Sequence, residues 1–124
     1  MQQNRPKHLN LIKIAFPLPA IVSGLHRISG LLLFLSLPAL LWLLQATLTS
    51  PEKFVQYHAC ITHPLVKLFF MPVLWAYMHH FCAGIRFLFL DVHKGLDLPT
   101  ARLTAKVVMI VSLILTALIG VLVW

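Results

Sequence analysis

The sequence predicts an all-α membrane protein with three transmembrane helices that pack in a helical bundle. Of its 124 residues, 60% are hydrophobic and only 10% are charged, which is far from the balance of a soluble globular domain. No charged side chain occurs in residues 28–51, 68–85 or 107–124. About 20 apolar residues, rising about 1.5 Å each, span the hydrocarbon core. Three spans therefore follow from three charge-free runs.

Residues 1–20 are expected to form a cytoplasmic interfacial arm. Three prolines, Pro6, Pro17 and Pro19, interrupt a weak alternation of Leu or Ile with Lys. A cleaved signal peptide is not expected, because the first apolar run begins only near residue 21 and no small-residue cleavage site follows it soon.

The remaining residues, 21–124, are predicted to form the transmembrane anchor domain, and its first span covers about 21–47. After it, Ser50 has the side chain of an N-cap, and Pro51 suits the first position of a helix. A short helix on the outer surface is therefore predicted over residues 51–61.

The second span is predicted over about 65–90 and the third over about 101–124. Polar and turn-forming residues 91–99 separate them. The third span carries small residues at four-residue spacing, which places them on one helix face where another helix can approach closely. These residues are Ser112, Thr116 and Gly120. A plain lipid-facing helix is the alternative for this span.

The net charge of +7 comes from ten Lys and Arg residues that flank the spans instead of forming one patch. We therefore expect no nucleic-acid partner. Four cations lie before or at the start of the first span, and four lie around the connection between the second and third. They are Arg5, Lys7, Lys13 and Arg27, then Arg86, Lys94, Arg102 and Lys106. Only Lys53 and Lys67 occupy the other connection, so the positive-inside rule predicts a cytoplasmic N-terminus and a C-terminus on the outer, periplasmic face.

Two polar islands interrupt the apolar runs, at residues 23–30 and 77–86. A charged side chain at the bilayer centre costs about 3 kcal/mol or more, so ionisable groups at membrane depth usually face a protein interior, a cofactor or water. Each island combines an imidazole, a small residue and an arginine. On neighbouring helices the two islands can enclose one redox centre.

In the second island, His80 and Gly84 are four residues apart and share a helix face. A flat macrocycle packed against a helix needs such a glycine notch beside its ligand, and histidine is a common axial ligand of haem iron. His79 points about 100° away from His80 and cannot share its target. One of the two is therefore a candidate haem ligand, while the other faces a neighbouring helix or water. The alternative is that both histidines only make interhelical hydrogen bonds.

In the first island, His26 and Arg27 lie near the cytoplasmic end of the first span. Arg27 is placed to reach a haem propionate or a quinone carbonyl, although a flanking arginine can also simply extend to the membrane surface. Ser23 lies one turn before Arg27 on the same face, and its hydroxyl can donate to a quinone oxygen or bond back to its own helix. A guanidinium and a hydroxyl in a site poor in water would stabilise the negative charge of a quinone undergoing reduction.

The motifs extend over nearly the whole chain. They are Arg5-Pro6 and Leu9, Ser23 to Gly30 with a His-Arg-x-Ser-Gly core, His80-x-x-x-Gly84-Ile85-Arg86, Asp91, and the ending Gly120-Val121-Leu122-Val123-Trp124. With these motifs the chain resembles the cytochrome b subunits that anchor bacterial succinate dehydrogenase, part of respiratory complex II, in the membrane.

The resemblance implies that His80, and not His79, is an axial ligand of haem b. It implies that a second small three-span subunit supplies the other ligand, so that the two subunits share the haem. Ser23 and Arg27 match residues of the family's ubiquinone site, and His26 and Arg27 match residues near the haem propionates. Asp91 matches an aspartate that we assign to proton delivery, with a solvated helix-end charge as its alternative. Phe87 departs from the pattern, because many members have a histidine there.

The resemblance also implies the reaction. A flavoprotein subunit oxidises succinate, an iron–sulfur subunit passes the electrons to ubiquinone, and this chain anchors the complex in the bacterial inner membrane without oxidising succinate itself. The nearest alternative is the membrane anchor of a fumarate reductase that uses menaquinone. A small proton- or ion-conducting subunit is another, in which the histidines and arginines line a path. A purely structural anchor is the third.

Overall fold

The computed structural model describes residues 14–123 as four helices, without a strand in that range. They are α1 (Leu18–Thr47), α2 (Pro51–Ile61), α3 (Pro64–Asp91) and α4 (Leu98–Val123). Three of them, α1, α3 and α4, are long and apolar enough to cross a membrane. The all-helical class with three candidate spans is thus confirmed. Most of the expected interfacial arm, as well as Trp124, lies outside the described residues.

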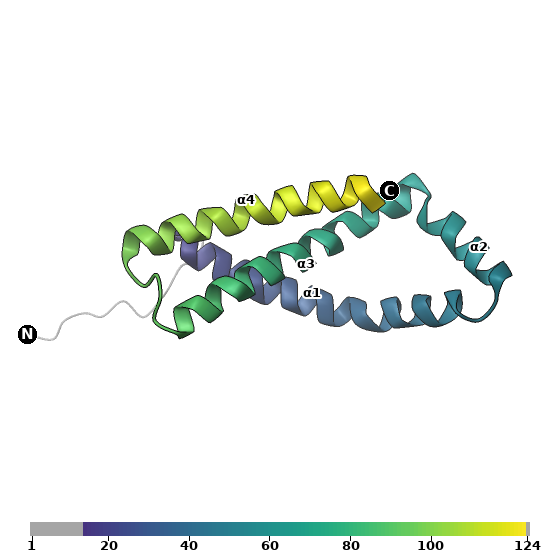
Figure 1. The fold of residues 1–124 in the computed structure, drawn as a ribbon, viewed down its shortest axis with the longest axis horizontal. Helices are drawn as coiled ribbons and strands as arrows, with labels where there is room; N and C mark the ends of the chain where they lie inside the picture. Colours follow the sequence, from purple (N-terminus) through teal and green to yellow (C-terminus); the bar gives the residue numbers. More distant parts are fainter. Residues whose placement is uncertain (1–13, 124) are drawn as a thin grey trace, which may run out of the picture.

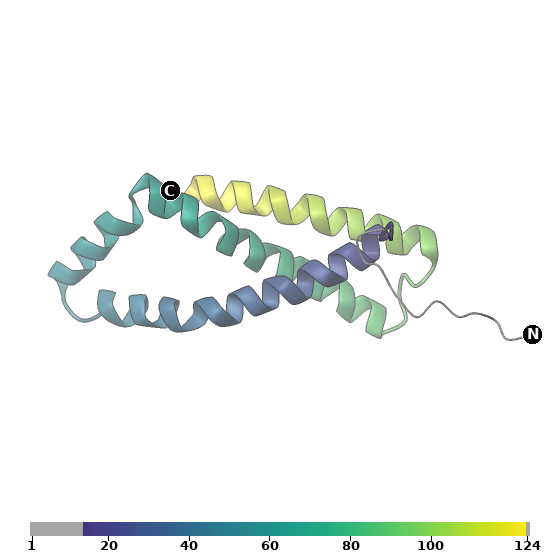
Figure 2. The same cartoon turned by 180° about the vertical axis from the view of Figure 1, so that it is seen from behind.

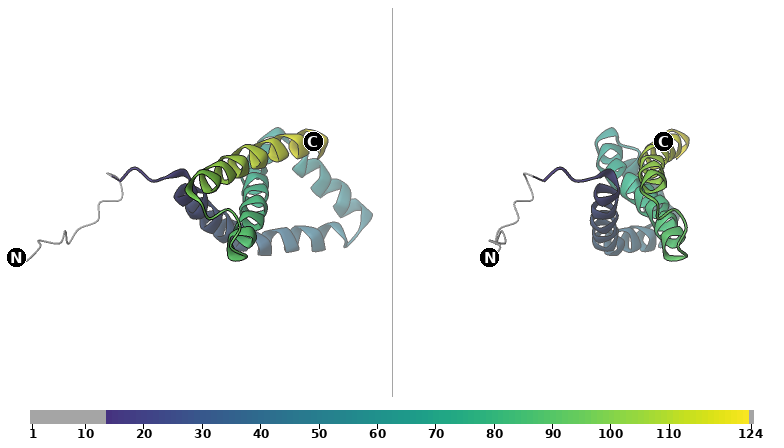
Figure 3. Two further views of the ribbon diagram at one scale, coloured as in Figure 1. Left: turned by 60° about the vertical axis from the view of Figure 1, so that its left-hand side comes forward. Right: turned by 90° about the vertical axis from the view of Figure 1, so that its left-hand side faces the viewer.

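The three long helices run along the length of the molecule, and α2 bridges α1 and α3 at one end (Figure 1). The same arrangement is visible from behind in Figure 2. Helix α3 contacts both α1 and α4, and α1 also touches α4. Viewed obliquely and end-on, α1 and α4 lie on different sides of α3 (Figure 3). Side chains of α3 therefore face two different neighbours, α1 and α4.

Capping residues set where the helices begin. The Ser50 hydroxyl accepts the Lys53 backbone N–H at 3.2 Å, which confirms the predicted start of α2. Asp97 caps α4 in the same way, because its Oδ2 accepts the Thr100 N–H at 3.0 Å. Hydrogen bonds from Thr100 also lower the pKa of Asp97, which keeps this exposed carboxylate charged.

Two helices begin earlier than the sequence patterns suggested. Helix α1 starts at Leu18 instead of residue 21, because Pro19 occupies its first turn, where a proline has no hydrogen bond to lose. The last residues of the expected arm are therefore helical. Helix α4 starts at Leu98 instead of residue 101, because Asp97 caps it.

The end of α3 is fixed by its own backbone. His93 and Lys94 donate their N–H groups to the carbonyls of Leu90 and Phe89, at 2.9 and 3.0 Å, and His93 has a φ of 59°. This is the Schellman pattern, in which a left-handed residue satisfies the last carbonyls of a helix. Gly95, with a φ of 73°, then turns the chain toward α4.

The interior of the bundle consists of small and polar residues, and large apolar side chains face outward. Val22, Ala76, Ala83 and Ala105 form much of the buried apolar set. Lipid tails are as apolar as leucine, so membrane helices associate through close packing of small residues and through hydrogen bonds. On α4, Ser112 and Thr116 are buried, and Gly120 lies against the Met71 side chain of α3. The predicted small-residue face of the third span is confirmed as its contact face.

Candidate functional site

The two polar islands meet where α1 packs on α3, and their centre is a pair of histidines. The imidazole rings of His26 and His80 stack with their centroids 4.1 Å apart and their planes 7° from parallel. His26 also meets the edge of the Phe87 ring at 5.0 Å between centroids. The structure therefore joins the candidate residues His26 and His80 in direct contact, across 54 residues of sequence.

Hydrogen bonds fix the orientation and the tautomer of His80. Its Nδ1 lies 3.0 Å from the backbone carbonyl oxygen of His26 and 3.3 Å from Oγ of Ser29. Since the Ser29 hydroxyl donates to the same carbonyl at 2.9 Å, and a carbonyl can only accept, Nδ1 donates its proton to that oxygen. The lone pair of a neutral His80 then resides on Nε2. Nε2 makes no hydrogen bond in residues 14–123 and is not buried.

This arrangement suits a histidine that binds a metal. Ligating histidines usually donate their other ring N–H to a carbonyl or carboxylate, which fixes the ring and increases its basicity. In the described part of the chain, no group of three His, Cys, Asp or Glu residues comes together to hold a free ion. Among the histidines of that part, His80 alone, through its Nδ1–H bond to the His26 carbonyl, has the geometry of a ligating histidine.

A glycine faces each of the two stacked rings from the opposite helix. A Cβ built on Gly30 would lie 2.9 Å from Cε1 of His80, so this ring fills the space that a side chain would need. A Cβ on Gly84 would lie 3.7 Å from Nε2 of His26. Gly84 therefore faces the His26 ring of α1, and its role as a notch for a macrocycle beside His80 stays a prediction. Each glycine on one helix makes room for the histidine of the other.

His79 has a different environment from its neighbour. It has no exposed surface, and its ring stacks against Trp75 with centroids 5.2 Å apart. The ring faces the backbone of Val22 on α1, yet neither of its nitrogens makes a hydrogen bond within the described residues. His79 is thus enclosed in the contact with α1, as expected for one of the two histidines, and it cannot reach a group outside this chain.

The other candidate residues surround the histidine pair at different depths. Arg27 is exposed and Ser23 is half-buried on α1, and neither side chain has a hydrogen bond or an ion pair within residues 14–123. Both are therefore free to meet a ligand or a partner subunit. Asp91 is exposed as the last residue of α3, at the helix end. The structure records no contact between Asp91 and the histidine pair.

Ser29 and Gly30 are contacts of His80 that the sequence reasoning did not assign. Both belong to the first polar island, and Ser29 follows His26 by three residues, so the two share a helix face. That spacing signals a common face but not which residue of α3 lies against it. Phe87 stood out in the sequence only because it departs from the family pattern, and the structure shows its ring packed against His26.

The chain is similar to known membrane subunits along nearly its whole length. Residues 1–119 match the family described as succinate dehydrogenase/fumarate reductase transmembrane subunit. The chain is 39% identical to the succinate dehydrogenase cytochrome b556 subunit of Coxiella burnetii, over 100% of both chains. It is 31% identical to the subunit of that name from Paracoccus denitrificans, over 93% of this chain and 88% of the relative. For the Rickettsia felis subunit the identity is 30%, over 92% and 87%.

Proposed function

The chain belongs to the succinate dehydrogenase/fumarate reductase transmembrane subunit family, and from this membership we propose that it is the haem-binding cytochrome b anchor of a succinate dehydrogenase. As a member it is a multi-pass membrane subunit of an oxidoreductase complex. Relatives named as succinate dehydrogenase subunits favour succinate oxidation over the fumarate reductase alternative. The proposal concerns the haem, the quinone site, the partners and the orientation in the membrane.

The geometry of His80 carries the haem proposal. Its Nδ1–H is held by the His26 carbonyl, so the lone pair of a neutral His80 lies on Nε2, which has no hydrogen-bond partner within residues 14–123. His80 would thus hold the iron of haem b through Nε2, and the second small anchor subunit would supply the other protein ligand. When bound, haem b accepts and releases single electrons. His26 and Arg27 would contribute positive charge or hydrogen bonds to its propionates.

Ser23 and Arg27 are proposed to bind ubiquinone. The Ser23 hydroxyl and the Arg27 guanidinium lie one helical turn apart on α1 and have no partner among the described residues. Reduction of a quinone to a quinol takes two electrons and two protons, and negative charge develops on its oxygens. Donors that are already in place stabilise this charge without reorganisation. Asp91, exposed at the end of α3, would deliver protons from the aqueous side.

The reaction requires partners that this chain does not replace. A flavoprotein subunit would oxidise succinate and give two electrons to an iron–sulfur subunit, which would pass them to the quinone at the cytoplasmic side of the bacterial inner membrane. The excess of cations near the α3–α4 connection is consistent with that side, with the C-terminus on the periplasmic face.

The first test is the reduced-minus-oxidised visible spectrum of the membrane complex purified through this chain. A sharp low-spin b-type band is expected with dithionite and also with succinate. If an intact, fully assembled complex has no haem band, His80 is not a haem ligand, and an ion-conducting or purely structural role gains support. If dithionite but not succinate gives the band, the haem is present but unconnected to succinate oxidation.

Replacement of Arg27 by alanine is expected to lower succinate-dependent quinone reduction by about tenfold or more, because one preorganised cation at the quinone oxygens is lost. Succinate oxidation with a soluble artificial dye should be unchanged, since that route bypasses the anchor. Arg102→Ala is the matched control, because Arg102 is an exposed arginine of α4. Equal losses in both assays would contradict a quinone role for Arg27.

A further inference from the structure

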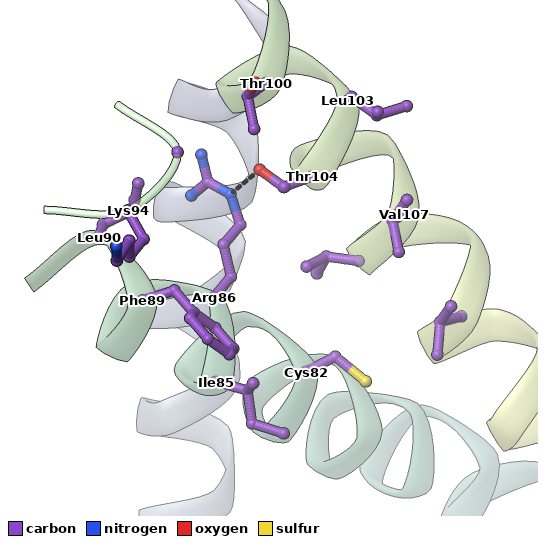
Figure 4. Close-up of a pocket in the computed structure, with 13 residues that line it drawn as sticks. Cys82, Ile85, Arg86, Phe89, Leu90, Lys94, Thr100, Leu103, Thr104 and Val107 are labelled. Carbon is purple, nitrogen blue, oxygen red and sulfur yellow. Dashed lines mark hydrogen bonds between the residues drawn. The ribbon is translucent and has the colours of Figure 1, made fainter. Parts of the chain in front are cut away.

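A cavity of about 490 Å³ lies between α3 and α4 (Figure 4). Apolar side chains of both helices form most of its wall, and polar groups gather at one end. The polar lining residues are Arg86, Lys94, Thr100 and Thr104, and the apolar ones include Ile85, Phe89, Leu103 and Val107. Nothing in the proposed haem or quinone sites uses this cavity.

Arg86 places a buried positive charge at this cavity. Only 7% of the residue is exposed, although the sequence had suggested a flanking cation. Its Nε donates to Thr104 Oγ1 at 3.1 Å, as drawn in Figure 4, and its Nη2 donates to the Ala101 carbonyl at 3.3 Å. Both partners are neutral, and Arg86 has no carboxylate partner in the described part of the chain. A guanidinium has five N–H donors, and these two bonds use only two of them.

The cavity has a charged end and an apolar end, as an amphipathic ligand does. Arg86 lies five residues before the end of α3, about 8 Å along the helix, and Lys94 lies in the following loop, so the charged end is close to the membrane surface. From Thr100 to Val111 the lining of α4 extends about 16 Å toward the other end of the helix, and its deeper part is entirely apolar. A headgroup thus matches one end and a hydrocarbon chain the other.

We propose that this cavity binds an anionic phospholipid, with its phosphate at Arg86 and Lys94 and one acyl chain along Ile85, Leu103 and Val107. Charge complementarity favours this occupant over a neutral partner helix, because basic pockets between membrane helices on the cytoplasmic side bind anionic lipid headgroups. Of the nearby carboxylates, Asp97 is engaged in capping α4. The site does not depend on the haem or quinone assignments, since its lining comes from α3, α4 and their connecting loop.

The test uses the whole complex purified through this chain, stripped of lipid in detergent and then incubated with phosphatidylglycerol or phosphatidylcholine. Native mass spectrometry counts the lipid that each sample retains. Phosphatidylglycerol should be retained at least about fivefold better than phosphatidylcholine, and Arg86→Gln should lower its retention by about fivefold. Arg102→Gln, which removes an exposed cation of α4 outside the cavity, should leave retention unchanged.

Two further variants cover the case in which Arg86→Gln prevents assembly. Lys94→Gln should reduce phosphatidylglycerol selectivity, and Val107→Trp should fill the apolar part and lower lipid retention while leaving every charge in place. Equal retention of the two lipids by the unaltered complex would overturn the proposal. Equal losses of retained phosphatidylglycerol in Arg102→Gln and Arg86→Gln would also overturn it, because they would indicate a general effect of surface charge. Loss of copurified quinone instead of phospholipid in Val107→Trp would overturn it as well.

Discussion

Replacement of His80 by alanine should remove the low-spin haem b signal almost completely. The variant loses the only imidazole within residues 14–123 that combines an Nε2 left without a partner with an Nδ1 bound to a backbone carbonyl. The partner subunit's ligand can retain some haem, so the coordination state is more informative than the yield. The measurement is the visible and electron paramagnetic resonance spectrum of the complex assembled with its partner subunits. Any retained haem should be high-spin.

His79→Ala is the matched control for this variant, since it removes the adjacent imidazole. His79 is fully enclosed and stacks on Trp75, so its loss should lower the stability of the α1–α3 contact but keep the low-spin spectrum of whatever complex assembles. A normal low-spin signal in His80→Ala, with loss of that signal in His79→Ala, would reverse the assignment of the two residues.

The membrane spans were predictable because the free-energy cost of placing a charge in hydrocarbon largely decides where they lie. Charge is costly in hydrocarbon, so charge-free runs of sufficient length mark the membrane helices directly in the sequence. The start of α2 was also predictable. Ser50 accepts a hydrogen bond from one of the free backbone N–H groups at the helix start, and Pro51 has no N–H that could be left without a partner. Helices α1 and α4 each extend three residues beyond the start of the predicted span, because Pro19 lies in the first turn of α1 and Asp97 caps α4.

The site was predictable only in part. Spacing along one helix singled out His79 and His80 together, and the resemblance to known subunits chose His80. The contacts that hold His80 come from α1, 51 to 54 residues away in sequence. Helix register across such a contact depends on which small residues let the backbones approach, so periodicity within one helix does not reveal it. For the same reason Arg86, placed among the flanking cations, is buried against α4.

Replacement of Gly30 by alanine should disturb the His80 ligand without touching either histidine. The new Cβ would lie 2.9 Å from Cε1 and 3.3 Å from Nδ1 of His80, closer than a methyl group and a ring can pack. The ring must move, and its hydrogen bond to the His26 carbonyl must lengthen or break. We expect shifted electron paramagnetic resonance g-values and an altered haem midpoint potential, and Gly30→Leu should remove most of the low-spin signal.

Gly24→Ala isolates the steric part of this effect. Gly24 lies on the same helix, six residues earlier, and a Cβ built on it meets nothing within 4 Å. Alanine favours the helix over glycine by about 1 kcal/mol at either position, so the change in helix propensity is common to both variants. Gly24→Ala should therefore retain the unaltered spectrum, and the difference between the two variants measures the contact with His80. If Gly30→Ala had the spectrum and potential of the unaltered complex, α1 would not position the His80 ring, and the ligand geometry would have to be set by α3 and the partner subunit alone.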